Sequence, residues 1–251
     1  MRGILNRMGF RVRAVNTASD SENKIHDDAV AAAYGFRRAL VPGVTVYGYL
    51  AATAVEHFGP EWLERGAMDV RFHQPVYEGD EVDVTVTPEG DGRVRIEAGQ
   101  CAAGTAWIGE HRPSYADDGP RPVERRKPSA ETLAVGTVLG ALLQRPVATE
   151  SRMSAPLDFS VGGRAHPAAL LALANRIFVE NYELGPWIHV SSEVRKFRPA
   201  RIDESVDVHA KIVEQYERNG HEFVVLDVLI SGAGPIEQVR HTAIWRPRIT
   251  R

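Results

Sequence analysis

The stretch from Ser19 to Tyr49 contains the residue types best suited to chemistry in this chain. It opens with a polar turn that holds Asn23 and His26, continues through a short amphipathic helix, and reaches Pro42-Gly43, where a longer apolar helix begins. An imidazole on a loop, followed by the exposed N–H groups of a helix start, can make a proton-transfer site that faces an oxyanion pocket. We therefore take this stretch as the candidate site.

Other site chemistries lack a signal in the sequence. The nine histidines are scattered without an H-x-x-x-H pair, and one cysteine cannot form a metal cluster. No dinucleotide fingerprint, P-loop or G-x-S-x-G motif occurs. We expect no bound metal and no cofactor.

Composition restricts the classes of partner. The 251 residues are 43% hydrophobic and 25% charged, with a formal net charge of −3 and no long basic run, which argues against a nucleic-acid partner. No apolar run approaches the roughly 18 residues that span a bilayer, so we expect no membrane segment. The single Cys101, expected as an inert thiol in a strand, fits a reducing compartment, and we expect a cytoplasmic protein.

An internal repeat organises the chain. Segments of the first half reappear 124 residues later, which indicates that one structural unit is made twice. The matched pairs are Val70–Pro75 with Val194–Pro199, Asp80–Val84 with Glu204–Val208, the apolar helix Val44–Phe58 with Ala168–Tyr182, and Arg11–Asn16 with Val135–Gly140.

Each copy combines one buried helix with several strands. Val82, Val84 and Val86 alternate with polar residues, as a half-buried strand requires, and Gly90–Gly92 and Arg218–Gly220 are hairpin signals at matching places. The pattern predicts an α+β fold in which an antiparallel sheet wraps around a central helix, twice. We predict repeats over residues 1–110 and 131–251, joined by a Pro-rich, charged linker over 111–130.

The segment Phe72–Val82, FHQPVYEGDEV, resembles the F-x-x-P-V-x-x-G-D-x-[LV] strand of the MaoC-like dehydratase/hydratase family, whose fold here would be a double hotdog. The same family has a turn of the form S-G-D-x-N-P-[LI]-H-x-D, and Ser19, Asn23, Ile25, His26 and Asp28 fall on its positions. The family's catalytic Asp falls on Ser21, with Asp20 as its neighbour. Pro42 replaces the His of the family's H-G-M, while Gly43 is kept.

This resemblance implies reversible addition of water to the double bond of an enoyl thioester. His26 would be the acid/base, and Asn23 and Asp20 its helpers. The N–H groups of Gly43 and Val44 would form the oxyanion site, Ser21 would position a water, and Tyr47 would add a pocket hydroxyl. Each residue also has a structural alternative: His26 and Asn23 bonding to turn backbone, Asp20 in solvent, Gly43 permitting close packing, and Tyr47 in the core.

The second copy lacks the turn, because the offset carries Asn23 onto Val147 and His26 onto Glu150. We therefore expect one site per chain, with the second copy supporting it and lining an acyl tunnel. His166 stands where Pro42 stands in the first copy, either as a structural residue at a helix start or facing the shared interface.

Three functions remain open. The first is a lyase of fatty acid metabolism, acting on an acyl-CoA or acyl-carrier-protein thioester, with CoA or phosphopantetheine present only as part of the substrate. The second is a hotdog thioesterase, which usually needs a carboxylate on the central helix; Glu56 and Glu180 lie near the helix ends and are poorly placed for this. The third is a non-catalytic subunit that binds acyl thioesters. Two hotdogs in one chain allow either a monomeric pseudo-dimer or a homodimer.

Overall fold

The computed structural model describes residues 9–19, 21–114, 124–148 and 163–249. Within them one ten-stranded, wholly antiparallel sheet runs through both halves of the chain. The first half contributes β1 (Gly9–Arg13), β2 (Gly66–Phe72), β3 (Glu81–Gly90), β4 (Arg93–Ala98) and β5 (Ala102–Ile108). The second contributes β6 (Leu142–Pro146), β7 (Ile188–Lys196), β8 (Ser205–Arg218), β9 (His221–Ser231) and β10 (Pro235–Arg246).

The strand order shows the repeat. From one edge to the other it is β1-β3-β4-β5-β2-β7-β10-β9-β8-β6, so each half follows the same sequence from its edge to the centre. The halves join where β2 pairs with β7, with Met68 opposite Val194. This antiparallel pairing of equivalent strands relates the two halves by a pseudo-twofold axis, and it makes the sheet continuous between them.

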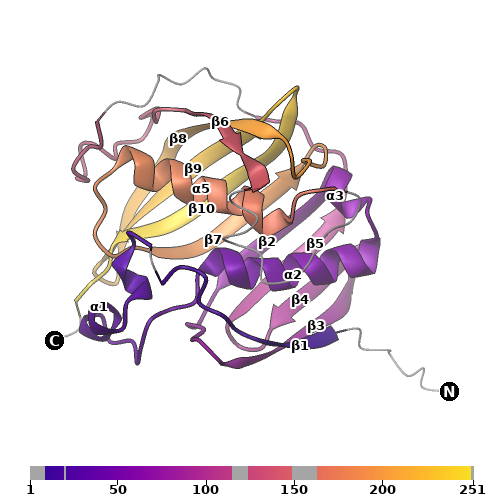
Figure 1. The fold of residues 1–251 in the computed structure, drawn as a ribbon, viewed down its shortest axis with the longest axis horizontal. Coiled ribbons are helices and arrows are strands. Elements are labelled where there is room, and N and C mark those ends of the chain that lie inside the picture. The colour runs from indigo at the N-terminus through magenta and orange to yellow at the C-terminus, as the bar shows by residue number, and fades with distance from the viewer. Residues whose placement is uncertain (1–8, 20, 115–123, 149–162, 250–251) are drawn as a thin grey trace.

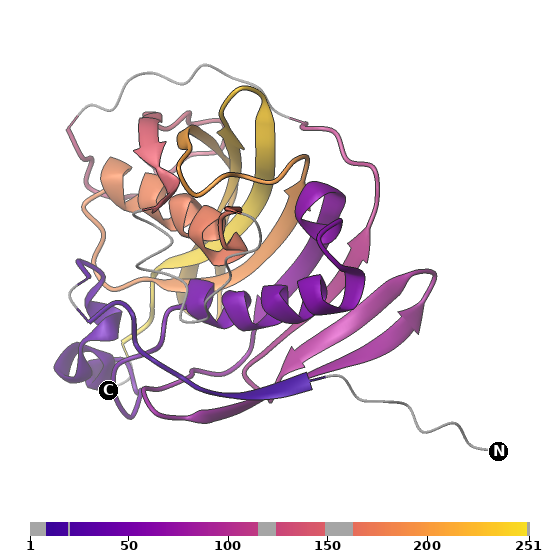
Figure 2. The ribbon, with the colours of Figure 1, turned by 45° about the vertical axis from the view of Figure 1, so that its right-hand side comes forward.

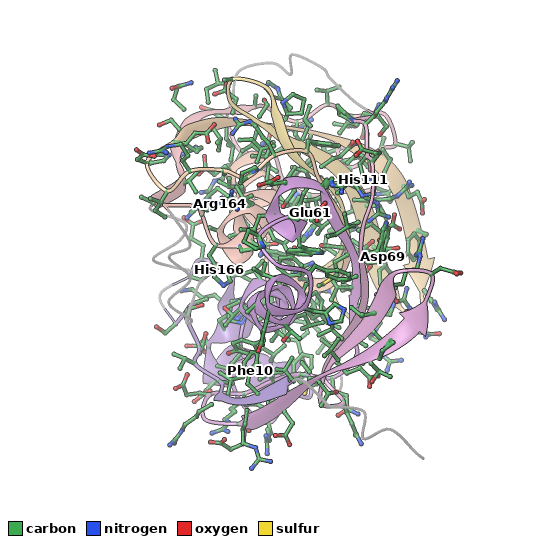
Figure 3. The ribbon with its side chains drawn as sticks, turned by 90° about the vertical axis from the view of Figure 1, so that its right-hand side faces the viewer. Phe10, Glu61, Asp69, His111, Arg164 and His166 are labelled. Atoms are coloured by element: carbon green, nitrogen blue, oxygen red, sulfur yellow. The ribbon has the colours of Figure 1, made fainter. Side chains whose placement is uncertain are left out.

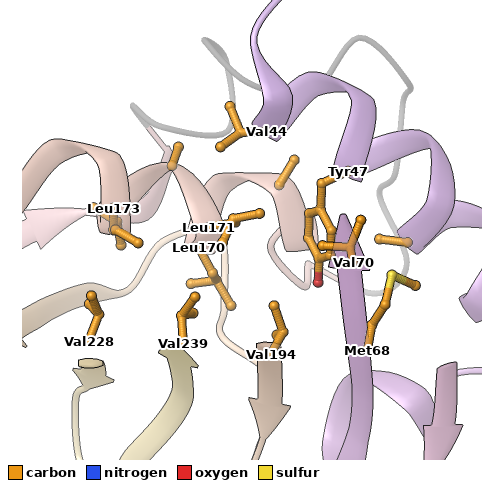
Figure 4. Close-up of a cluster of buried hydrophobic side chains, with 14 of the residues drawn as sticks. Val44, Tyr47, Met68, Val70, Leu170, Leu171, Leu173, Val194, Val228 and Val239 are labelled. Atoms are coloured by element: carbon orange, nitrogen blue, oxygen red, sulfur yellow. The ribbon is translucent and has the colours of Figure 1, made fainter. Parts of the chain in front are cut away.

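Two long helices lie side by side against the concave face of this sheet, α2 (Gly43–Phe58) from the first half and α5 (Pro167–Asn181) from the second (Figures 1 and 2). Seen end-on, α2 lies inside the curve of the sheet (Figure 3). Its residues are apolar on nearly all sides because it is covered by strands on one side and by α5 on another. Side chains of both helices and both half-sheets meet in one core; ten of them are labelled in Figure 4.

Shorter helices precede and follow α2 in the chain. A 3-10 helix η1 (Lys24–His26) leads into α1 (Asp28–Ala33), and α3 (Trp62–Arg65) follows α2. Asp27 caps α1, its carboxylate accepting a hydrogen bond from the N–H of Val30 at 3.1 Å. The turn thus ends in a fixed structure rather than in an open loop.

The strand predictions are confirmed in most details. Val82, Val84 and Val86 are buried on one face of β3, and both predicted hairpins join neighbouring strands. Asn219 and Gly220 have φ values of 54° and 77°, the left-handed backbone that an Asn-Gly hairpin turn requires. The second strand pair is longer than the first, with 14 and 11 residues against 10 and 6.

The repeat alignment is wrong at the first strand. The 124-residue offset carries Glu81, where β3 begins, onto Ser205, where β8 begins, but it does not carry β1 onto β6. Phe10 pairs with Val84, whereas Leu142 pairs with Val208, so β6 begins after the predicted Val135–Gly140 segment. The first strands are short edge strands, and few buried positions fix their register.

Among the described helices, none is long and apolar enough to cross a membrane.

Candidate active site

A cavity of about 300 Å³ lies where the two halves meet at the start of α2. The first half contributes residues of the predicted turn, of the helix start, and of the loop after β2. The second half contributes residues of α5 and β7. The lining that concerns the chemistry is Asn23, His26, Pro42, Gly43, Phe72, Cys101, Asn175, Trp187 and His189.

His26 lines this cavity with its ring orientation fixed from behind. Its Nδ1 lies 2.7 Å from the carbonyl oxygen of Leu40, which can only accept, so Nδ1 carries the proton and Nε2 keeps its lone pair. Burial lowers the pKa of His26, and the bond to the Leu40 carbonyl opposes that shift. The imidazole is therefore suited to accept a proton at neutral pH.

The segment that carries Leu40 is itself held in place. The N–H of Ala39 donates to the carboxylate of Asp28 at 2.7 Å, and the N–H of Leu40 donates to the carbonyl of Ile25. Asp28 is one of the positions that match the family turn, and its contact here is to backbone. It acts on His26 through the loop that supplies the Leu40 carbonyl.

Asn23 joins the turn to the second half of the chain. Its side-chain N–H donates to the carbonyl of Trp187 at 3.0 Å, while its Oδ1 accepts from the N–H groups of Trp187 and Ile25 at 3.2 and 3.3 Å. The amide thus pairs with Trp187 much as a neighbouring strand would. These bonds hold the turn that carries His26 against the second half of the chain.

The N-terminus of α2 opens onto the cavity without a side-chain cap. Its N-cap residue is Pro42, which offers no acceptor, and the described residues supply no acceptor for the N–H groups of Gly43 and Val44. Such a helix start favours negative charge. Gly43 lines the cavity, whereas Val44 does not, and the side chain of Val44 belongs to the hydrophobic core (Figure 4).

Gly43 is required by a close approach. A Cβ on it would lie 2.8 Å from Nδ1 of His189, a contact that side chains essentially never make. The glycine therefore lets an imidazole of the second half lie directly beside the helix start.

The predictions for the remaining single residues have different outcomes. Asp20 lies outside the described residues. Ser21 accepts a hydrogen bond from the N–H of Asn23 at 3.0 Å, which makes it part of the turn. Tyr47 is fully buried in the core and does not line the cavity, although its hydroxyl has no partner among the described residues. Cys101 lies in the turn between β4 and β5, not in a strand, and burial raises its thiol pKa.

Sequence reasoning missed the contributions of the second half. His189 on β7 and Asn175 on α5 line the cavity, and Asn175 Oδ1 has no partner among the described residues. Their juxtaposition with His26 depends on the pairing of the two halves, which one sequence does not show. The sequence did contain one signal of a polar site in the second half. His241 shares a buried face with Val239 and Ala243 on β10, which is an unusual place for a histidine, and its ring lies beside that of His189.

The start of α5 differs from that of α2. His166 is its N-cap, and Nδ1 accepts from the N–H of Ala168 at 3.1 Å. The ring also packs against Gly48 of α2, where an added Cβ would lie 3.2 Å from its Cε1 atom, and burial lowers its pKa to about 4. Figure 3 shows His166 beside the end-on α2. The helix start equivalent to the cavity end of α2 is therefore closed by its own side chain.

Carboxylates on the central helices are remote from this chemistry. Glu56 is exposed near the end of α2, and Glu180 forms ion pairs with Arg145 and Arg176. Neither lines the cavity. Across the part of the chain that the structure describes, no group of three His, Cys, Asp or Glu residues could hold a metal ion.

Comparison with known proteins finds a family match for part of the first half of the chain. Residues 17–108 match the family described as MaoC like domain, and no curated protein matches the chain. A putative MaoC domain dehydratase from Chloroflexus aurantiacus J-10-fl superposes with a TM-score of 0.66 at 11% identity, covering 96% of this chain and 94% of that one.

Two other solved structures are similar over nearly the whole chain. An N-terminal dehydratase from the difficidin assembly line has a TM-score of 0.54 at 15% identity, covering 96% and 94% of the two chains. A putative oleoyl thioesterase from Lactobacillus plantarum has a TM-score of 0.52 at 12% identity, covering 97% and 99%. At such identities the similarity shows the fold. The chain has the double-hotdog fold, and its residues 17–108 are similar to the MaoC like domain family.

Proposed function

We propose that this protein is a MaoC-like hydratase/dehydratase that adds or removes water at the α,β position of an acyl thioester, with His26 as acid/base. One observation carries the proposal. A neutral histidine with its Nδ1 bonded to backbone lines the same cavity as an uncapped helix start, so a proton acceptor and an oxyanion site serve one pocket.

The proposed chemistry needs one acid/base. In hydration, Nε2 of His26 takes a proton as the water oxygen bonds to the β-carbon. The π electrons move to the thioester oxygen, where the N–H groups of Gly43 and Val44 stabilise the enolate. The enolate collapses as His26 returns the proton to the α-carbon, and one water has been added. Dehydration is the reverse, so Ser21 in place of a carboxylate does not prevent the reaction.

A groove of about 250 Å³ supports CoA as the carrier. It shares Val190 and His221 with the cavity, so the two adjoin. Arg71 and Arg218 line it, and neither forms a salt bridge within the described chain. The rings of Tyr216 and Phe223 in the same groove are stacked, with centroids 4.7 Å apart. Guanidinium groups bind phosphates and aromatic rings stack on bases, which matches the nucleotide end of CoA.

The test is a purified-protein assay with crotonyl-CoA and longer trans-2-enoyl-CoAs, following loss of the enoyl absorbance. His26→Ala should lower kcat by roughly 10²- to 10⁴-fold, the usual contribution of a general acid/base. His57→Ala, at an exposed position near the other end of α2, is the matched control and should retain full rate. Asp20→Asn should also retain most of the rate, because the mechanism uses no carboxylate.

The carrier is tested with the same acyl group on pantetheine, which lacks the nucleotide. Arg71→Gln and Arg218→Gln should raise KM for the CoA thioester several-fold and leave the pantetheine thioester unchanged. Equal effects on both would favour an acyl-carrier protein.

The single Cys101 supports action in the reducing cytoplasm.

Two results would replace the proposal. Release of free thiol without loss of the double bond would indicate a thioesterase, the activity ascribed to the Lactobacillus plantarum protein of similar fold. Binding of acyl thioesters without turnover of any chain length would indicate a binding subunit.

A further inference from the structure

A second histidine reaches the cavity from the opposite half of the chain. His189 is 8% exposed, yet its ring lines the cavity beside Gly43 and the start of α2. Phe72 and His241 flank the ring, with centroids 4.6 and 4.2 Å from it. Its Nδ1 has no hydrogen-bond partner among the described residues. A buried polar atom of this kind requires a partner, and the cavity is the place where one can be supplied.

The other ring nitrogen of His189 belongs to a hydrogen-bonded chain. Nε2 lies 2.8 Å from the hydroxyl of Ser192, and that hydroxyl lies 3.1 Å from Nδ1 of His241. A serine hydroxyl has a single proton, so it donates to one imidazole and accepts from the other. Two arrangements follow, and they give His189 opposite tautomers.

The environment of His241 favours one arrangement. Its Nε2 is buried without a hydrogen-bond partner in the described chain. Either arrangement leaves one buried N–H without a partner among the described residues: Nε2 of His241 if the serine donates to His241, or Nδ1 of His189 if it donates to His189. His241 is fully buried away from the cavity, whereas His189 lines the cavity, where a ligand can accept that N–H. The serine therefore donates to His189, which places the His189 proton on Nδ1, toward the helix start.

We propose that His189 is a third oxyanion donor, giving its Nδ1–H to the thioester oxygen together with the N–H groups of Gly43 and Val44. Ser192 and His241 are positioning residues that hold it in this tautomer. The inference rests on the proposed function, because it assigns the oxygen of the same acyl thioester.

A neutral imidazole is suited to this role. Burial is the main cause that lowers the pKa of His189, and the neighbouring His241 adds to the shift, so the ring stays uncharged. A neutral donor polarises a carbonyl without surrendering its proton to the enolate. Since the donor is already fixed by the protein, no reorganisation is needed as charge develops on the oxygen.

The test separates this role from turnover by using a bound chromophore. A 2,4-dienoyl-CoA absorbs at longer wavelength when donors polarise its carbonyl, so its spectrum on the protein reports the oxyanion site directly. Wild type and His26→Ala should both shift the band to the red, although only wild type turns over enoyl-CoA. His189→Phe should lose most of the shift and lower kcat by roughly 10²- to 10³-fold, as removal of one oxyanion donor does.

His189→Asn should restore most of the shift and the rate, because its amide N–H occupies nearly the position of Nδ1–H. Ser192→Ala should lower both the spectral shift and kcat in part, because the tautomer of His189 is then no longer fixed by the serine hydroxyl. His57→Asn is the control, and circular dichroism checks that each variant folds. A wild-type ¹⁵N spectrum showing His189 protonated on Nε2 would overturn the inference, as would a His189→Phe protein with unchanged spectrum and kcat. A wild-type protein that shifts the dienoyl-CoA band to the red but does not turn over any enoyl-CoA would instead overturn the proposed hydratase function.

Discussion

At the residue scale, the question is how Ser21 can stand where the family turn has its carboxylate. A serine hydroxyl cannot act as a base by itself, and here it accepts the N–H of Asn23 within the turn. His26 is different, because the Leu40 carbonyl fixes its proton on Nδ1. A single base can serve both proton transfers when both reacting carbons face it. In the proposed mechanism the chemistry is carried by His26 and the helix start, and a second acid/base is not needed.

The protonation state of His26 leads to a prediction about how kcat/KM depends on pH. In the proposed mechanism the neutral form of His26 is the active one. Burial lowers the pKa of this histidine below the ordinary value of 6.5. We expect kcat/KM for crotonyl-CoA to be level around neutral pH and to decline only once the pH falls below 6.5, through the lowered pKa. The profile of His57→Asn should superpose on that of wild type. An acidic limb with its midpoint above 6.5 would assign the essential base to another group.

Gly43 supports a second prediction. In Gly43→Ala the added methyl group would lie 2.8 Å from Nδ1 of His189 and would push that ring away from the helix start. We expect kcat to fall roughly 10- to 100-fold, as small displacements in an active site do. The thermal midpoint should change little, because alanine favours helix. Gly185→Ala, where nothing lies within 4 Å of the added Cβ, is the matched control. Full activity in Gly43→Ala would show that the close approach is only structural.

At the element scale, the two central helices begin in different ways, although they are equivalent in the repeat. Pro42 leaves the N–H groups of α2 open to the cavity, whereas the imidazole of His166 closes those of α5. A helix start can serve stability or a ligand, but the same N–H groups cannot serve both at once. In the proposed function, the N–H groups at the start of α2 are therefore available to bind a ligand, whereas those at the start of α5 are used to stabilise the fold.

The cap on α5 makes stability depend on pH. The pKa of His166 is about 4 in the folded protein against 6.5 normally, chiefly because of burial, with the Lys196 ammonium adding to the effect. Between these values the unfolded chain binds more protons, so stability is fully present above pH 6.5 and falls as the pH drops toward 4. The loss from this residue is about 3 kcal/mol.

The measurement is the free energy of unfolding in urea at several pH values between 4 and 7. His166→Asn keeps a capping oxygen but cannot titrate, so its stability should fall less steeply with decreasing pH. The buried His241, whose pKa is about 3, should keep part of the slope. His57→Asn should parallel wild type. If His166→Asn had the wild-type slope, the imidazole would be protonated in the folded state.

Prediction from sequence succeeded where the signal is local and failed where it depends on the pairing of the halves. The apolar run after Pro42 gives α2, and the alternation from Val82 gives β3. His26 and Gly43 were predicted to share a site because a short segment joins them. Asn23 bonds to its own turn at Ile25, as one of the two alternatives expected, but it also bonds to Trp187, which lies 164 residues away. The same distance in sequence hid His189.

At the scale of the whole molecule, a pseudo-twofold sheet could carry two sites, and the asymmetry of the helix starts decides how many remain. Among the residues that the structure describes, only the first half combines a histidine-bearing turn with an open helix start. The equivalent helix start in the second half is capped by His166 and packed against Gly48. The second half instead gives His189 and Asn175 to the site of the first.

We therefore predict one acyl-thioester site per chain. Titration calorimetry with butyryl-CoA, which has no double bond to hydrate, should give a stoichiometry of one. Gly43→Ala should weaken this binding, because the displaced His189 and the helix start hold the thioester oxygen. His166→Asn should leave the stoichiometry at one, since it changes the cap and adds no turn. Two equivalent sites in wild type would mean that the helix start of α5 opens in solution, and the division of roles between the repeats would then be wrong.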